Sequence, residues 1–292
     1  MKRAFSMVEL IMTIVIMGIL SSGAYIAVSH LYTRAAKSKA ISELSFDSTL
    51  ISDQISALLY NRVPATVIGY DTNSSTFESI YNLTTAYNTL EWIGTDVDRY
   101  KDGTYSGFID FKKSDKETDM IYSPDTADIN GSALIFAGSF DEGSVVYDEA
   151  DFNNSFGWHD NNHTKIFEIN TTSIGAELSL TTHPSKIYEK YYLLKSAYTI
   201  TKYDDNLSSC TSISNLAITP DDNTLLLFYD YKPWKGENFC DDAKVTTLSK
   251  EAKGFSVDFV NGNLQFNLTL ERTVRKRGKD LTIQVSKQKV VF

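Results

Sequence analysis

Residues that break regular structure are scarce in this 292-residue chain, which has only 5 Pro and 15 Gly and no Pro before Pro64. The hydrophobic residues make up 42% of the chain and the aromatic residues 12%, with 17 Tyr and 16 Phe among them. This composition excludes a disordered chain and favours a strand-rich body. At this length the chain can bury a core in one large domain or two ordinary ones.

Positive charge is also in short supply, because 28 Lys and Arg stand against 37 Asp and Glu, for a net charge of −9. This balance excludes a general surface for polyanions. The sequence lacks a Gly-rich phosphate loop and a nucleophile elbow, and its four His are scattered. We therefore expect neither enzymatic activity nor an organic cofactor.

Cysteine is limited to two residues, Cys210 and Cys240. An even count in a chain with an export-like N-terminus predicts one disulfide in an oxidising compartment. The alternative is two buried thiols without a bond. A zinc site is disfavoured, because neither residue has a second Cys or a close His beside it.

The N-terminus supplies what the rest of the chain lacks, a long apolar run. Residues 4–20 read AFSMVELIMTIVIMGIL, with Glu9 as the one acid. As a helix, residues 5–28 span about 36 Å, enough to cross a bilayer. Lys2 and Arg3 precede the run and predict a cytoplasmic start, with the rest of the chain outside. A carboxylate in hydrocarbon costs about 2.5–3.5 kcal/mol, so Glu9 needs an explanation; the simplest one is an acid that reaches back to the interface.

The helical pattern continues past the apolar run, where apolar and small residues recur at steps of three, four and seven. The stripe comprises Leu31, Ala35, Ser38, Ile41, Leu44, Ile51, Ile55 and Leu58. We predict one helix whose residues 5–28 form a transmembrane half and whose residues 29–60 form an amphipathic half. A cleaved secretory signal peptide, ending near Ala24, is the rival interpretation, but it would not be continuous with such a helix.

Residues 61–292 change to short apolar and aromatic runs between turn residues, which predicts β structure. The expected strands are 65–70, 105–113, 132–138, 164–170, 176–180, 186–203, 224–231, 254–260, 263–274 and 280–292. The last three alternate apolar and polar residues and predict an antiparallel meander. The fold class is therefore α+β, with a long N-terminal helix followed by an antiparallel β-rich domain.

Within residues 1–28, a basic leader of four residues precedes Phe5, Glu9 and the apolar run that contains Gly18. This register resembles the prepilin N-terminus of type IV pilins and of the pseudopilins of type II secretion and competence machines. In that family an aromatic residue starts the mature chain and a Glu follows at its fifth position. Two positions depart from the family pattern: Ala4 stands where Gly is usual, and Ile26 lies where many members have a kinking Pro.

The resemblance implies that a prepilin peptidase removes residues 1–4 by cleaving after Ala4, and that Phe5 becomes a methylated N-terminus. It implies that Glu9 is an assembly latch, which pairs with the N-terminal ammonium of a neighbouring subunit and so escapes its desolvation penalty. The implied partners are other pilins or pseudopilins and the inner-membrane assembly platform. The implied location is the inner membrane, with a periplasmic body, and then a pilus or pseudopilus. A body of roughly 230 residues resembles a minor subunit rather than a compact major one.

The body also contains two patterns of metal-ligating residues. Asp96, Asp98 and Asp102 precede Gly103 at spacings that resemble part of a calcium loop, although the downstream Glu of an EF-hand is missing. A solvated turn is the alternative. His159 and His163 are four apart, but the surrounding Asn and Gly favour a loop without a metal.

Six Asn share the pattern acid-x-Asn-x-Ser/Thr, which resembles the acceptor sequon of bacterial N-glycosylation. They are Asn73, Asn130, Asn153, Asn162, Asn170 and Asn206. Acidic loops rich in Asn and Ser also generate such strings by chance.

Basic residues gather at one expected hairpin tip, which could contact DNA phosphates. They are Arg272, Arg275, Lys276, Arg277 and Lys279. A solvated turn is the alternative, because no aromatic residue is interleaved to stack on bases.

The sequence thus favours a minor pilin or pseudopilin subunit that assembles through its N-terminal helix. The alternatives are a secreted binding protein with a signal peptide and an anchored periplasmic protein that never polymerises.

Overall fold

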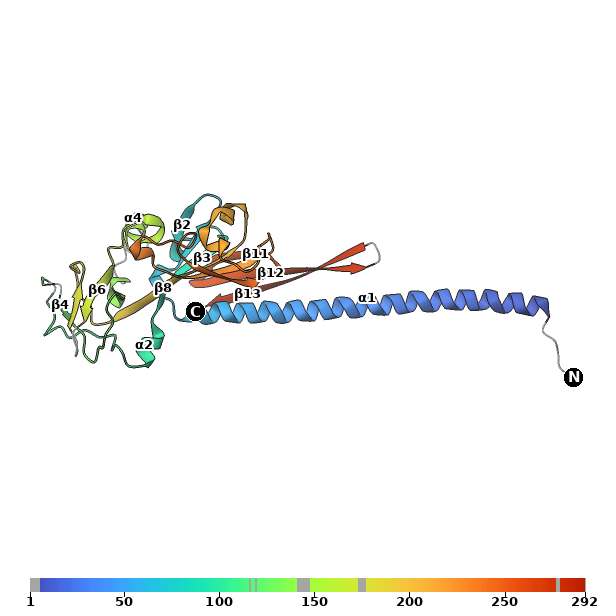
Figure 1. Ribbon diagram of the computed structural model, residues 1–292, viewed down its shortest axis with the longest axis horizontal. Helices are drawn as coiled ribbons and strands as arrows, with labels where there is room; N and C mark the ends of the chain where they lie inside the picture. The colour runs from blue at the N-terminus through green and yellow to red at the C-terminus, as the bar shows by residue number, and fades with distance from the viewer. Residues whose placement is uncertain are drawn as a thin grey trace. The chain divides into compact units, whose positions relative to one another are not determined.

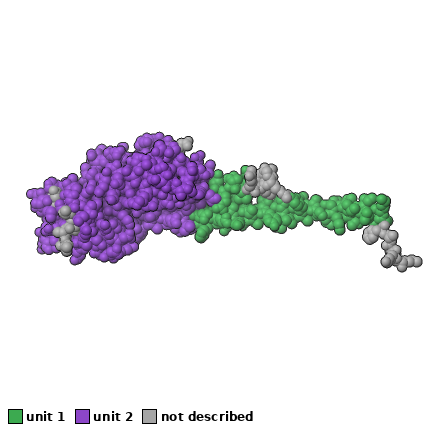
Figure 2. All heavy atoms as spheres, in the orientation of Figure 1, with its two compact units in different colours: residues 1–47, 271–285 green, residues 48–270, 286–292 purple. Residues whose placement is uncertain are grey.

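The computed structural model describes residues 6–115, 117–118, 120–140, 148–172, 177–276 and 279–291. The predicted leader residues, together with Phe5, lie outside this set. The chain divides into two compact units (Figure 2). Unit 1 comprises Met1–Asp47 and Glu271–Val285, and unit 2 comprises Ser48–Leu270 and Ser286–Phe292.

The N-terminal element is one α-helix, α1 (Met7–Tyr60), which is 54 residues long (Figure 1). No Pro interrupts it, and its last turn tightens where Asn61 and Arg62 donate backbone hydrogen bonds to carbonyls three residues back. Pro64 then begins the short helix η1 (Pro64–Thr66). The predicted helix is therefore confirmed, and it ends at Tyr60 as expected.

The amphipathic stripe of α1 is partly as predicted. In unit 1, Leu44 is buried, whereas Leu31 and Ile41 are exposed. In unit 2, Ile51 and Ile55 are fully or almost fully buried. The stripe therefore acts as a packing surface only toward the C-terminal end of the helix.

The larger sheet of unit 2 is antiparallel in every strand pair of known register. Its ten strands in the described chain are β1 (Ile68–Asp71), β2 (Thr76–Ser79), β3 (Thr89–Thr95), β4 (Met120–Tyr122), β5 (Ala133–Phe136), β6 (Ile166–Thr172), β7 (Glu177–Leu180), β8 (Tyr191–Lys202), β9 (Leu225–Tyr231) and β10 (Lys244–Ser249). The main path runs β2-β1-β3-β8-β5-β6-β7-β4. The 12-residue β8 pairs with β3 along one edge, and with β5 and then β9 along the other.

The second sheet has the order β11-β12-β13, formed by β11 (Ala252–Val260), β12 (Asn263–Lys276) and β13 (Lys279–Val291). A tight turn at Asn261 and Gly262, both with positive φ, joins β11 to β12. The predicted C-terminal meander is thus present, and the α+β fold class is confirmed.

Short helices and turns cover the larger sheet, and two clusters of buried side chains form its core. The short helices are η2 (Ile80–Asn82), α2 (Val97–Lys101), η3 (Ala137–Phe140), α4 (Glu149–Asn153), η4 (Trp158–Asp160), η5 (Asp205–Ser209), α5 (Thr211–Ser214) and η6 (Pro233–Lys235). Trp158 of η4 is fully buried and donates its indole N–H to the carbonyl of Thr66, 3.1 Å away. That bond fixes η4 against η1.

The strand expected at residues 105–113 is wrong. Gly107 has a φ of 76°, and Asp110 starts a turn in which its side chain accepts the Lys112 N–H at 2.9 Å. Tyr105 and Ile109 are nevertheless buried in the core. The alternating pattern therefore reports burial correctly, but the left-handed Gly prevents an extended strand.

Candidate assembly site

Glu9 lies in the first turn of α1, where it forms a reciprocal cap with Ser6. The Ser6 N–H and hydroxyl donate to Oε2 of Glu9 at 3.1 and 3.2 Å, and the Glu9 N–H donates to Oγ of Ser6 at 3.3 Å. This is the capping box of a Ser followed three residues later by a Glu. The carboxylate of Glu9 thus satisfies backbone and hydroxyl donors of its own chain at the start of the helix.

Two hydroxyl side chains of the apolar segment, Thr13 and Ser22, bind carbonyls of the helix itself. The hydroxyl of Thr13 donates to the Glu9 carbonyl at 2.6 Å, and the hydroxyl of Ser22 donates to the Ile19 carbonyl at 2.8 Å. Back-bonding of this kind removes the need for water around each hydroxyl. The apolar run therefore contains Glu9 as its single charged group among residues 6–28.

Residues 6–28 are exposed around the whole circumference of the helix in the single chain. Large side chains such as Met7, Ile14 and Leu20 each leave more than half of their surface uncovered. Among the described residues, α1 is the one helix long and apolar enough to cross a membrane by length and composition. An apolar surface of this extent needs lipid or protein to cover it.

The family described as the prokaryotic N-terminal methylation motif matches residues 1–25. Residues 1–25 thus carry a prepilin-type N-terminal methylation motif, which supports the type IV pilin and pseudopilin family for this chain. Comparison with curated proteins and with solved structures gives no significant match. The matched segment contains Glu9 and the beginning of the apolar helix, so the resemblance expected from the register of Phe5 and Glu9 is confirmed.

This family is structural rather than enzymatic, and its motif fits processing by cleavage and methylation. A single apolar N-terminal helix suits anchoring of the prepilin-type protein in a membrane. The cleavage and methylation residues, Ala4 and Phe5, lie outside the described residues, so their roles stay predictions.

In unit 1 of the prepilin-type protein, Arg272 of β12 binds two acids of α1. Its guanidinium lies 2.5 Å from the Glu43 carboxylate and 3.6 Å from Asp47. Arg272 was expected to belong to a basic hairpin tip, but these acids compete with any phosphate. The side chains of residues 275–279 lie outside what the structure describes, and the DNA contact stays a prediction.

In unit 2, β13 makes polar contacts with the last turns of α1. Lys287 donates to the Thr49 hydroxyl at 2.7 Å, and Lys289 donates to the Asp53 carboxylate at 2.9 Å. The hydrogen bond and charge of Lys289 lower the pKa of Asp53. The solvent-accessible ion pair of Lys289 and Asp53 contributes little stability, but together the two contacts specify which face of the helix the strand meets.

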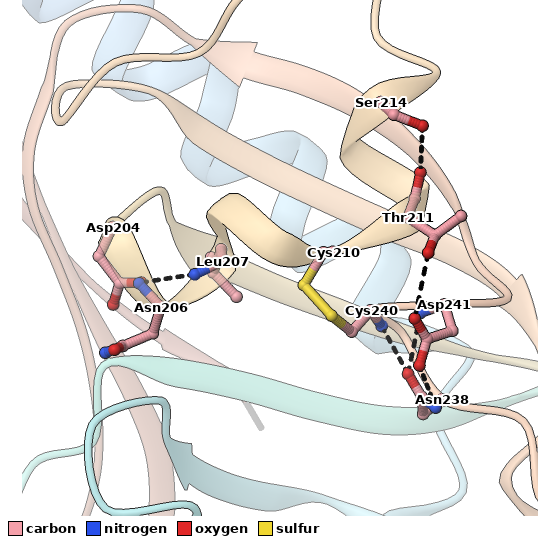
Figure 3. Close-up of a disulfide and its surroundings, with 9 residues drawn as sticks. All are labelled: Asp204, Asn206, Leu207, Cys210, Thr211, Ser214, Asn238, Cys240 and Asp241. Atoms are coloured by element: carbon pink, nitrogen blue, oxygen red, sulfur yellow. Dashed lines mark hydrogen bonds between the residues drawn. A yellow bond between two sulfur atoms is a disulfide. The ribbon is translucent and has the colours of Figure 1, made fainter.

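Cys210 and Cys240 form a disulfide in the body of the prepilin-type protein (Figure 3). Cys210 ends η5 and caps α5, whereas Cys240 lies in the loop before β10. Around the bond, Asn238 accepts the Cys240 N–H at 2.9 Å, and Ser212 donates its N–H to the Cys240 carbonyl at 2.9 Å. The disulfide fits the sequence expectation and ties η5 and α5 to that loop.

A buried polar network that the sequence did not predict centres on Glu91 of β3, whose partners come from β8, β9 and η4. The Glu91 carboxylate is almost fully buried and contacts Nε2 of His159 at 3.0 Å. It also accepts hydrogen bonds from Tyr231 at 2.8 Å and Thr199 at 3.2 Å. Burial lowers the pKa of His159, but the charge of Glu91 and the hydrogen bond to it together raise that pKa above its usual value. His159 therefore neutralises a buried acid and is not half of a metal pair with His163.

The three acids of the expected calcium loop do not converge on one point. Asp96 caps α2 and lies 3.6 Å from Arg99, and the carboxylate of Asp98 binds Lys195 at 2.7 Å. Asp102 is the C-cap of the same helix and is exposed. Among the described residues, no three His, Cys, Asp or Glu side chains gather to hold a metal. Calcium at these residues remains a prediction.

Five of the six sequon Asn are exposed, and the exception is Asn153 in α4. Asn73 lies in the turn between β1 and β2, where its Oδ1 accepts a hydrogen bond from Nδ2 of Asn206 at 3.1 Å. Two of the expected acceptors thus contact each other, so a glycan on Asn206 would have to replace the Nδ2 hydrogen that does not bond Asn73. The remaining exposed acceptors are Asn130, Asn162 and Asn170.

A cavity of about 350 Å³ lies beside α2, and no sequence motif marks it. Its walls include the rings of Tyr100, Tyr105, Phe108 and Tyr191, and Lys190 lies 5.6 Å from the Phe108 ring. Apolar walls with a few polar groups are typical of small-molecule sites. The residues come from three separate segments, which explains why no local pattern predicted the cavity.

Proposed function

We propose that the chain is a minor pilin or pseudopilin subunit that assembles into a type IV pilus, a type II secretion pseudopilus or a competence pseudopilus through α1. The observation that carries this proposal is the position of Glu9, which is the single acid among the exposed apolar residues 6–28 and lies in the segment that matches the methylation motif. The size of the body, with its ten-stranded sheet, supports a minor rather than a repeating shaft subunit.

The geometry of the cap is compatible with a second partner for Glu9. Both donors from Ser6 bind Oε2, and no donor within the described residues binds Oε1. The ammonium of a neighbouring Phe5 could therefore bind Oε1 without opening the cap. A charged donor forms a stronger bond than the neutral donors of Ser6, particularly away from water.

We further propose that the N-terminus is cytoplasmic and the body periplasmic. Lys2 and Arg3 precede the apolar helix, which favours retention of this end in the cytoplasm. The disulfide between Cys210 and Cys240 needs an oxidising compartment, which favours the periplasmic side for the body.

Two variants separate the latch from the cap in cells of the source organism. Glu9→Gln retains the shape and an acceptor but loses the charge. Ser6→Ala removes both hydroxyl hydrogen bonds of the cap while it retains the charge and the backbone donor. If Glu9 pairs with an ammonium, Glu9→Gln abolishes incorporation into sheared filaments or into crosslinks with other pilins, whereas Ser6→Ala retains most of it. Equal losses in both variants would show that Glu9 serves only to cap the helix.

Mass spectrometry of the mature chain tests the alternative of a secreted protein with a signal peptide. A methylated N-terminus at Phe5 is expected for a prepilin-type subunit. A start near Tyr25 would refute the proposal, because a signal peptidase would then have removed the latch.

A further inference from the structure

The cavity beside α2 in unit 2 is enclosed mainly by aromatic rings, and we call it the aromatic cavity. Its volume of about 350 Å³ falls within the range of small-molecule sites. Tyr105 and Tyr191 are buried, and their ring centroids lie 5.8 Å apart. Tyr100 lies 5.6 Å from Tyr105, and both Tyr100 and Phe108 are exposed. The aromatic cavity therefore offers a continuous apolar surface that a flat ligand can reach from solvent.

Backbone pairing holds the walls of the aromatic cavity in place. Phe108 and Lys190 form an antiparallel bridge, so their side chains leave the same face of the chain. Beside this bridge, the Tyr191 N–H donates to the Gly107 carbonyl at 3.0 Å. The Ala137 N–H donates to the Lys190 carbonyl at 2.9 Å and so ties η3 to the same segment. The cavity is therefore pre-formed, as small-molecule sites usually are.

Charge indicates which kind of ligand the aromatic cavity favours. Among the described residues that line it, Lys190 is the one that carries a charge. Its Nζ lies 5.6 Å from the centroid of the Phe108 ring, within reach of a cation–π contact. Lys190 forms no ion pair with an acid in the described part of the chain. An anionic ligand would therefore meet an ammonium that no carboxylate of the protein already occupies.

The hydroxyl groups of the aromatic cavity are largely bound within the protein. Those of Thr95 and Tyr105 donate to backbone carbonyls at 3.0 and 3.3 Å. The Tyr191 hydroxyl bonds the Ser123 hydroxyl at 2.8 Å. A saccharide needs partners for several hydroxyls of its own, whereas an apolar ring needs none. The aromatic cavity therefore favours an apolar ring with one anionic group over a sugar.

We propose that the aromatic cavity binds a small aromatic carboxylate, with its ring against Tyr100 and Tyr105 and its carboxylate on Nζ of Lys190. The residues involved all belong to unit 2. The site includes neither α1 nor the methylation motif, so it is independent of the proposed assembly through Glu9. It makes the β-rich body a binding domain for a ligand of defined chemistry.

Fluorine NMR titration of para-fluorocinnamate tests the site, with the full-length protein in a neutral detergent and empty micelles as the blank. Binding should saturate with a dissociation constant of about 0.1–1 mM, as expected for a ligand of this size. The neutral para-fluorocinnamamide should bind about three- to tenfold more weakly, because it loses the charged contact. Absence of saturable cinnamate binding would overturn the proposal. Tighter binding of glucuronate, measured by competition, would overturn it in favour of a saccharide.

A charge variant and a matched control locate the carboxylate. Lys190→Met retains an unbranched stem without the ammonium, so it should weaken the carboxylate about three- to tenfold and leave the amide unchanged. Unchanged amide binding also shows that the cavity is still folded. Lys113→Met removes another Lys that lies over an aromatic ring, 4.2 Å from the Tyr122 centroid and outside the cavity, and should change neither affinity. Equal effects of Lys190→Met on the two ligands would refute the pairing with Lys190.

Two further variants locate the ring of the ligand. Tyr100→Ala removes an exposed wall of the cavity and should weaken the carboxylate and the amide alike, by about three- to tenfold. Tyr60→Ala removes an exposed ring at the end of α1 and is the matched control, with no expected effect. Ala137→Leu should fill the cavity and abolish binding of both ligands. Undiminished binding in Tyr100→Ala and Ala137→Leu would place the ligand elsewhere and contradict the proposal.

Discussion

Reducing the disulfide between Cys210 and Cys240 should destabilise the body by an amount that follows from the length of the loop it closes. The bond closes a loop with a sequence separation of 30 residues. In the chain-entropy description, a loop of this length stabilises the folded state by about 3.5 kcal/mol. For a body of 150–250 residues, roughly 2–4 °C of unfolding temperature correspond to 1 kcal/mol, so the expected decrease is about 7–14 °C.

The measurement is thermal unfolding of the full-length protein in detergent, with and without a phosphine reductant. The double variant Cys210→Ala/Cys240→Ala is the matched control, because it cannot form the bond. Reduction should lower the unfolding temperature of the parent protein to near that of the double variant. The reductant should leave the double variant unchanged.

Amide hydrogen exchange shows which segments lose stability when the disulfide is reduced. Cys210 and Cys240 join η5 and α5 to the loop before β10, and both cysteines pack in the hydrophobic cluster that includes Phe228 of β9. Reduction should speed exchange first in residues 205–214 and 236–243, because these have short elements and few ladder hydrogen bonds. A decrease of less than about 2 °C on complete reduction would refute the loop-entropy reasoning, since residual structure would then already hold the two segments together.

Two further predictions concern the body. Because the pKa of His159 is raised, its pair with the buried Glu91 should stabilise the fold fully below about pH 6.5, and that contribution should be lost as the pH rises through the folded-state pKa. His159→Gln should therefore reduce the pH dependence of the unfolding temperature between about pH 6 and pH 8.5. The control His163→Gln should leave that pH dependence unchanged. Gly157→Ala should destabilise by more than the roughly 1–2 kcal/mol of left-handed strain, because the new Cβ would lie 2.8 Å from the Pro233 backbone. Gly131→Ala, at a similar φ with open space, should cost only the strain, so equal unfolding free energies for the two variants would contradict the clash.

The helix could be predicted in full because its signals are local. An apolar run, a continuous 3.6-residue pattern and the absence of Pro before Pro64 depend on neighbouring residues only. The extent of its buried stripe was less predictable, because exposure of Leu31 and Ile41 depends on which other elements reach that part of the helix.

Strand β3 was missed because it is buried on both faces. Its sequence, TLEWIGT, shows no alternation, and six of its seven residues are buried. The acidic Glu91 also disfavours a central strand, because an acidic side chain is rarely buried unless it is paired. Its partner His159 is 68 residues away, so no spacing rule could connect the two.

The position of Glu9 in the apolar helix was predictable from the sequence, but its hydrogen bonds with Ser6 in the single chain were not predicted. The letters S-M-V-E already contain the capping box, and the structure shows that Ser6 supplies two donors to the carboxylate. Before assembly, Glu9 is therefore not an unpaired acid, and pairing with an ammonium cannot recover the whole cost of a bare carboxylate in hydrocarbon. The free energy gained on assembly would then come from one new charged hydrogen bond at Oε1, because the cap at Oε2 stays in place. In the proposed assembly, this smaller difference would leave most of the free energy to the apolar packing of residues 6–28, and Glu9 would serve mainly to set the register between subunits.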